Sequence, residues 1–185
     1  MTTRLCLSFC ALAVVAAAAL AQAPAAPPAN PISASEKGVY LMLSGVVISA
    51  AEKMPEENYA FKPSPDVRTF GQLVGHLADS QYYFCSLAAG ETAPASDAEK
   101  SKTSKADLVS ALKDAVAFCS AKYAAMTDEK GSQMTKLMNF DLARLTVLSG
   151  NFAHLYEHYG NMATYMRIKG IVPPTSEKSA GPEKK

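Results

Sequence analysis

Apolar side chains recur every three to four residues along most of this chain, which is the spacing of one face of an α-helix. Residues that end helices bound these stretches, namely Pro55, Gly90 and the pair Pro173-Pro174 after Gly170. No stretch alternates apolar and polar residues for long enough to predict a β-strand. The sequence therefore predicts an all-α fold, most simply a four-helix bundle.

Three of the four predicted helices begin with residues that are typical of helix N-termini. Two of these starts are capping-box patterns, Ser33-x-x-Glu36 and Thr69-x-x-Gln72. Residues 90–103, which are rich in Ser, Thr, Ala and Lys, are expected to form a loop, while residues 128–138 fit no clear pattern. The helices are expected after Ser33, Thr69 and Ser104, and from about Phe140 to Lys169.

The N-terminal residues differ in composition from the rest of the chain. Arg4 precedes an apolar stretch, Leu5–Leu20, and Ala19-Leu20-Ala21 has the small-x-small pattern of a signal-peptidase site. A membrane anchor is the alternative, but the stretch is shorter than the roughly 20 residues that a span needs. The expected organisation is a signal peptide at 1–21, a Pro/Ala-rich leader at 22–34, one helical domain at 35–174 and a disordered tail at 175–185.

Charge, hydropathy and cysteine spacing exclude several classes of protein. The net charge is +1, which gives no basic surface for nucleic acid. A mean hydropathy near zero excludes a protein with many membrane spans. No C-x-x-C motif is present, so neither a zinc ribbon nor a haem-attachment site is expected. After signal cleavage we expect an exported protein, periplasmic or secreted, that is free of the membrane.

The chain has three histidines, His76, His154 and His158. His154 and His158 are four residues apart on the fourth predicted helix and so lie on one face of it. If that helix runs antiparallel to the second, His76 lies at about the same height. Three imidazoles at one level can hold a transition metal and leave coordination positions open. The alternative, that all three are ordinary core residues, is an energetically costly way to fill a core.

Three stretches together resemble the motifs of one protein family. They are TFGQLVGHLAD at residues 69–79, HLYEHYGN at residues 154–161 and YMRIKGIVPP at residues 165–174. This combination of a second-helix histidine, a late H-x-x-x-H and a final R-x-x-G-x-x-P-P resembles DinB/YfiT-like proteins over roughly residues 35–175.

The resemblance implies a four-helix bundle with up-down-down-up topology that carries one divalent metal. The metal ligands would here be His76, His154 and His158, and the ion would be zinc, nickel or iron. Many members have Arg-Gly-Gln after the last histidine, whereas this chain has Tyr159-Gly160-Asn161. Because these positions lie beside the metal, the substrate class does not carry over.

The implied topology also bears on the two cysteines outside the signal peptide. With the second and third helices parallel, Cys85 and Cys119 would lie at nearly the same height, where they could form a disulfide. In an up-down-up-down bundle their heights would differ by about 15 Å, which is too far to bond. The alternative is two buried, unpaired thiols, since Cys119 lies on an apolar stripe.

Asp79, Glu157 and Tyr159 lie within about one turn of the histidines and are candidates to orient an imidazole or hold a water. Each carboxylate is equally well explained as a solvated charge on a helix face. Two functions follow: a metal-dependent hydrolase or group transferase acting on a small molecule, or an exported bundle that binds metal or a small ligand without turnover. A homodimer is compatible with either.

Overall fold

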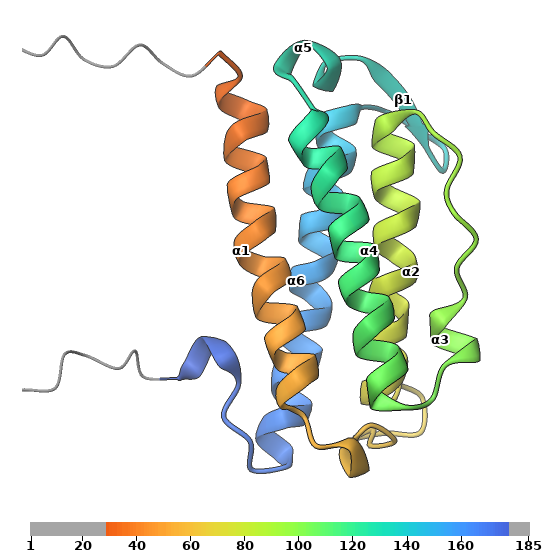
Figure 1. Cartoon of the computed structure of the whole chain (residues 1–185), viewed down its shortest axis with the longest axis vertical. Coiled ribbons are helices and arrows are strands. Elements are labelled where there is room, and N and C mark those ends of the chain that lie inside the picture. Colours follow the sequence, from red (N-terminus) through yellow and green to blue (C-terminus); the bar gives the residue numbers. More distant parts are fainter. Residues whose placement is uncertain (1–28, 178–185) are drawn as a thin grey trace, which may run out of the picture.

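The computed structural model describes residues 29–177 and is mostly helical (Figure 1). The predicted signal peptide, most of the predicted leader and residues 178–185 lie outside the described residues. None of the described helices is long and apolar enough to span a membrane. The four long helices are α1 (Pro31–Lys53), α2 (Phe70–Ala89), α4 (Lys105–Ala125) and α6 (Arg144–Ile168). The short elements are η1 (Glu56–Asn58), α3 (Ala98–Ser101), α5 (Asp128–Gly131), β1 (Met134–Leu137), β2 (Phe140–Ala143) and η2 (Pro174–Ser176).

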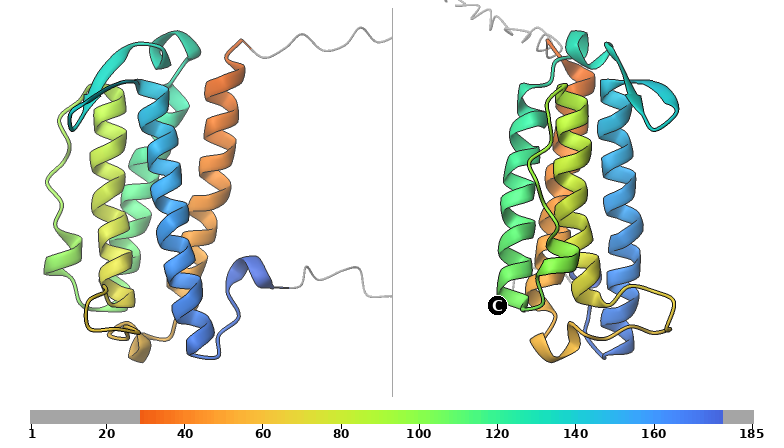
Figure 2. Two further views of the ribbon diagram at one scale, coloured as in Figure 1. Left: turned by 180° about the vertical axis from the view of Figure 1, so that it is seen from behind. Right: turned by 90° about the vertical axis from the view of Figure 1, so that its right-hand side faces the viewer.

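The four long helices pack side by side around one core (Figures 1 and 2). Helices α2 and α4 point in one direction, and α1 and α6 point in the other. Helix α2 contacts both α4 and α6, and α1 contacts the same two helices from the other side. The connection from α2 to α4 returns along the length of the molecule and places α3 against α2.

Several predicted helix ends are confirmed. The Thr69 hydroxyl accepts the backbone N–H of Gln72, and the Gln72 side chain accepts that of Thr69, which completes the capping box of α2. Gly90 ends α2 with φ of 74°, a left-handed conformation that favours glycine. Ser104 caps α4 by accepting the backbone N–H of Asp107.

The predicted start of the first helix is wrong. Helix α1 begins at Pro31, inside the segment assigned to the leader, and Ser33 lies within its first turn. A residue distant in sequence does the capping: the Asp128 carboxylate accepts the backbone N–H groups of Ile32 and Ser33, at 3.2 and 2.8 Å. Glu36 does not complete a capping box; its carboxylate accepts a hydrogen bond from the Ser149 hydroxyl. Proline is favoured at a helix start because its missing N–H needs no partner there.

A β-hairpin, β1–β2, contradicts the prediction of a fold without strands. Because β2 takes up residues 140–143, the last helix begins at Arg144 rather than near Phe140. Met138 occupies the turn with φ of 54°. Each strand has only four residues, so neither is long enough to display a period-two pattern.

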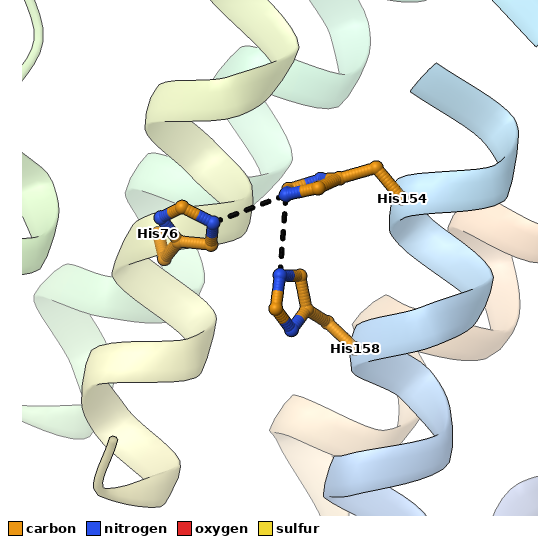
Figure 3. A group of neighbouring side chains, drawn as sticks. All are labelled: His76, His154 and His158. Carbon is orange, nitrogen blue, oxygen red and sulfur yellow. Dashed lines mark hydrogen bonds between the residues drawn. The ribbon is translucent and has the colours of Figure 1, made fainter. Parts of the chain in front are cut away.

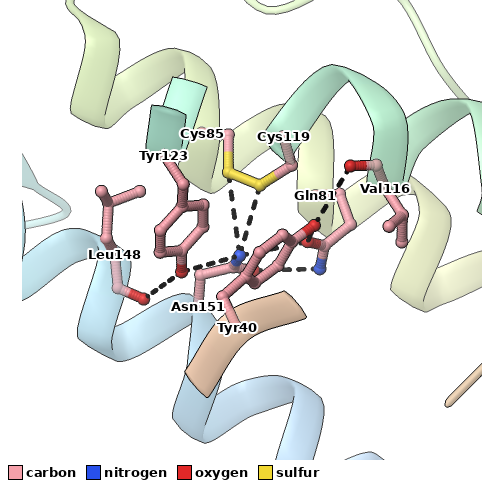
Figure 4. Close-up of a disulfide and its surroundings, with 8 residues drawn as sticks. All are labelled: Tyr40, Gln81, Cys85, Val116, Cys119, Tyr123, Leu148 and Asn151. Carbon is pink, nitrogen blue, oxygen red and sulfur yellow. Dashed lines mark hydrogen bonds between the residues drawn. A yellow bond between two sulfur atoms is a disulfide. The ribbon is translucent and has the colours of Figure 1, made fainter. Parts of the chain in front are cut away.

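A polar network is buried at the centre of the helices (Figure 4). The Tyr40 hydroxyl donates to the Gln81 side-chain oxygen at 3.0 Å, and the Gln81 and Asn151 amides bond reciprocally at 3.0 and 3.1 Å. The Tyr40 ring stacks on that of Tyr123, whose hydroxyl donates to the Leu148 carbonyl. Burial raises the pKa of both tyrosines well above the usual range, so both stay protonated donors.

A disulfide between Cys85 and Cys119 lies beside this network and joins α2 to α4. Their Cα atoms are 5.3 Å apart, which puts the two cysteines at one height on helices that point the same way (Figure 1). Asn151 donates its side-chain N–H toward both sulfurs, at 3.7 and 3.4 Å. The disulfide and the polar network, which includes Tyr40 of α1, therefore join all four long helices.

Replacing Gln81 with methionine should lower the free energy of unfolding by about 1–3 kcal/mol, because the buried side-chain oxygen of Asn151 then loses the N–H that donates to it. Urea denaturation of the purified protein measures this. Gln133→Met is the matched control, since Gln133 is exposed before β1 and its substitution should change little. Equal stability of the two variants would contradict the stabilising role of the network.

Asp128→Asn should destabilise the protein only above acidic pH. The Ser33 backbone N–H lowers the pKa of the Asp128 carboxyl below its ordinary value. The stabilisation is therefore complete above the unfolded pKa of about 3.9 and disappears as the pH falls through the lowered folded value. Urea midpoints measured across this range should converge at low pH for wild type and variant. Asp141→Asn, at an exposed position of β2, should show no such difference; a pH-independent gap for Asp128→Asn would contradict the prediction.

Candidate metal centre

Two helices bring the three histidines together (Figure 3). His76 lies on α2, and His154 and His158 lie one turn apart on α6. The Nε2 atom of His154 is 3.1 Å from Nε2 of His76 and 3.1 Å from Nε2 of His158. The predicted cluster is therefore present, and its ring nitrogens could hold a metal ion.

One ring nitrogen from each histidine lies within 4.8 Å of the other two, and two of the three separations fit a transition metal. Zinc–imidazole bonds of about 2.0–2.1 Å place two ligand nitrogens about 2.8–3.4 Å apart, for bond angles between a right angle and the tetrahedral value. The two 3.1 Å separations fall inside that range. Imidazole suits zinc, copper, iron and nickel alike, so the donor set fits a metal without selecting one.

The outward-facing Nδ1 atoms of the histidines have three different environments. Nδ1 of His76 is 2.9 Å from the Glu99 carboxylate, and Nδ1 of His158 is 3.4 Å from the Asn161 side-chain amide. Nδ1 of His154 is buried and has no hydrogen-bond partner among residues 29–177. At His76 the Glu99 carboxylate can accept a proton carried on Nδ1, which leaves the Nε2 lone pair of that ring free, as metal ligation requires.

Burial keeps the α6 histidines neutral near pH 7. It lowers the pKa of His154 to about 4, and repulsion from His158, His76 and Arg68 adds to the effect. Burial also lowers the pKa of His158. Neutral imidazoles have the free lone pairs that a metal needs, so the protein holds these ligands ready to bind.

Glu99 also contacts the histidine cluster, and no pattern in the sequence predicted this. One carboxylate oxygen contacts His76, and the other accepts the Arg68 Nε–H at 2.8 Å. Burial raises the pKa of Glu99, but the Arg68 hydrogen bond and charge, helped by His76, outweigh it and lower the pKa overall. Glu99 lies on α3, inside the segment expected to be a plain loop, and no local pattern indicated its role.

The residues predicted to orient the imidazoles lie in other environments. The Asp79 carboxylate accepts the backbone N–H groups of Ala98 and Glu99, at 2.8 and 3.0 Å, and so binds the chain that carries Glu99. The Tyr159 hydroxyl bonds to Thr175 at 2.7 Å. Glu157 is exposed on α6 and lines a cavity next to His158.

That cavity has a volume of about 620 Å³ and reaches the histidines at His158. Its wall is mostly polar and charged, and three parts of the chain supply it: residues 62–73, Glu99 of α3, and α6. Arg68 and Tyr165 are far apart in the sequence but come into contact here. The Tyr165 hydroxyl donates to the Arg68 carbonyl at 3.1 Å. A small polar molecule would fit this space beside His158.

The sequence model of the DinB superfamily matches residues 45–170, which include all three histidines. A DinB-like protein from Bacillus cereus ATCC 10987 has a similar structure, with a TM-score of 0.65 at 14% identity over 73% of this chain and 93% of that one. A DinB-like protein from Bacillus subtilis has a TM-score of 0.62 at 19% identity over 78% of this chain and 99% of that one. No curated protein sequence matches this chain.

At these identities the solved structures show a common fold. The sequence match itself covers more than half of the chain, and it contains the whole of α2 and of α6, the two helices that carry the histidine cluster. The chain belongs to the DinB superfamily.

Proposed function

We propose that this chain binds one divalent transition metal, zinc, nickel or iron, and serves as an exported hydrolase or group transferase for a small molecule. The ligands would be Nε2 of His76, His154 and His158. The observation that carries the proposal is the convergence of these three nitrogens, two pairs of them 3.1 Å apart. When bound, a divalent metal supplies Lewis acidity, which makes water, a hydroxyl or a thiol a better nucleophile at neutral pH.

The chain's own residues supply binding and orientation. Glu99 fixes the ring of His76, and burial keeps His154 and His158 neutral. The cavity beside His158 offers charged groups of both signs, among them Arg68 and Glu157, to orient a polar substrate. Its size supports a substrate of small-molecule dimensions.

The cavity favours an enzyme over the alternative, a bundle that binds metal or a small ligand without turnover. A non-catalytic site is expected to close over its metal, and Tyr159 directly follows His158 in the sequence. The Tyr159 hydroxyl instead bonds to Thr175, and the space next to His158 is open to solvent. A substrate could therefore reach the imidazoles.

We also propose that the long helices form an up-down-down-up four-helix bundle, as the family resemblance implies. The directions of the ribbons in Figure 1 support it. So do contacts at one end of the molecule: Lys105, at the start of α4, donates to the Glu52 carbonyl near the end of α1, and Gly71, at the start of α2, donates to the Tyr59 carbonyl. Both α2 and α4 thus begin where α1 ends.

Export rests on the predicted signal peptide at residues 1–21, and the Cys85–Cys119 disulfide supports it. Disulfides persist in oxidising compartments and are rare where glutathione and thioredoxin keep thiols reduced. The mature protein would be periplasmic or secreted.

Metal content should depend on the histidine pair of α6. The mature protein, exported from a bacterial host, should contain about one equivalent of zinc, nickel or iron, and the His154→Ala/His158→Ala variant should contain almost none, because one ligand cannot hold the ion. Elemental analysis per chain measures this. Tyr156→Ala is the matched control, since Tyr156 is exposed between the two histidines and its loss should leave the metal in place. A wild-type protein that stays metal-free after reconstitution would contradict the proposal.

Export should leave two chemical marks on the natural protein. Its N-terminus should lie near residue 22. The denatured protein should not react with a thiol reagent until a reductant breaks the disulfide and frees Cys85 and Cys119. Intact-mass spectrometry before and after alkylation measures both. A chain that keeps its first 21 residues together with free cysteines would overturn the assignment.

A further inference from the structure

The α3 turn, Ala98–Ser101, is fastened to α2 directly beside His76. Gly75 permits the close approach: a Cβ at that position would stand 2.6 Å from the Glu99 Cα and 2.8 Å from the Ala98 carbonyl carbon. Any side chain there would force the α3 turn away. Gly75 is thus a helical glycine whose missing side chain has a packing reason.

The Asp79 carboxylate supplies the second attachment. Its two oxygens accept the backbone N–H groups of Ala98 and Glu99, and Asp79 also accepts the Ser96 hydroxyl. Asp79 lies one turn beyond Gly75 on α2, so the two act on the same face. The third attachment is Arg68, which precedes α2 and donates its Nε–H to Glu99.

These attachments leave the Glu99 side chain with one oxygen 2.9 Å from Nδ1 of His76 and the other held by Arg68. A carboxylate that accepts Nδ1–H fixes both the ring orientation and the tautomer that leaves Nε2 unprotonated. The carboxylate also makes Nε2 of the imidazole more basic and so a stronger metal ligand. Of the three histidines, His76 is the one with a carboxylate partner at its outer nitrogen among the described residues.

We propose that Glu99 is a positioning residue for His76, and that Gly75 and Asp79 deliver it by docking the α3 turn on α2. The inference rests on the proposed metal site, but it concerns a hydrogen bond that exists with or without the ion. It gives a function to the stretch between α2 and α4, whose local sequence shows none. It also explains why Gly75 and Asp79 flank His76 in the sequence.

The first test is the tautomer of His76 in the metal-free protein, read from imidazole ¹⁵N–¹H correlation spectra at a pH where histidines are neutral. Wild type should carry the proton on Nδ1, and Glu99→Ala should shift it toward Nε2. Glu99→Gln, which keeps an acceptor oxygen, should retain part of the Nδ1–H population. A His76 ring protonated on Nε2 in wild type, or unchanged in Glu99→Ala, would overturn the proposal.

The second test is the affinity for zinc, measured by competition with a chromophoric chelator. Glu99→Ala should weaken binding by about 10–100-fold, the usual effect of losing such a partner. Glu157→Ala is the matched control, because it removes the same charge from the same cavity without touching an imidazole in the structure. Equal losses in both variants would mean that Glu99 acts only through its charge and would contradict positioning.

The docking part is tested by Gly75→Ala, which should reproduce the tautomer shift and the affinity loss of Glu99→Ala. The double variant should be no worse than either single one, because both break the same contact. Thermal melts establish that each variant is folded. Additive losses would overturn the docking role. If wild type shows the Nδ1–H tautomer but binds no metal, the proposed function fails and the positioning of His76 by Glu99 stands.

Discussion

Helices α2 and α4 point the same way, so the chain between them must return along the length of the molecule, and much of the structure depends on that return. It brings Cys119 to the height of Cys85, where the disulfide joins the two helices. It also carries the α3 turn past His76, which a tight turn at the end of α2 could not do. A single constraint of topology thus produces both the covalent link in the core and the carboxylate at the candidate metal centre.

The histidine cluster disfavours the protonated, positively charged form of its imidazoles. His154 is buried against His76 and His158, and burial lowers its pKa to about 4. Three neutral imidazoles with converging lone pairs repel one another unless a proton or a cation lies between them, so the cluster is suited to a metal. Glu99 sits at the outer nitrogen of His76, where it can hold the ring in place while the inner nitrogen stays free.

Local signals made the second and third helices predictable. Thr69 with Gln72, Ser104 and Gly90 each act through hydrogen bonds or φ preferences within a few residues. The three histidines could be placed because two lie on one helix face and the third lies at a matching height.

The predictions that failed concern contacts between residues that are far apart in the sequence. Asp128 caps α1 from 95 residues away, so the Ser33 pattern misplaced its start. Glu99 reaches His76 from 23 residues away through a loop that no periodicity describes. The hairpin rests on pairing between β1 and β2, in strands too short for a pattern.

The central claim is that three imidazoles from α2 and α6 form one metal site. X-ray absorption spectroscopy of the mature protein loaded with zinc tests it most directly, because the spectrum reports ligand type, number and distance. The account predicts three imidazole nitrogens at about 2.0–2.1 Å, and two in a His76→Ala variant. Coordination by sulfur, or by oxygen atoms with fewer than three imidazoles, would contradict it.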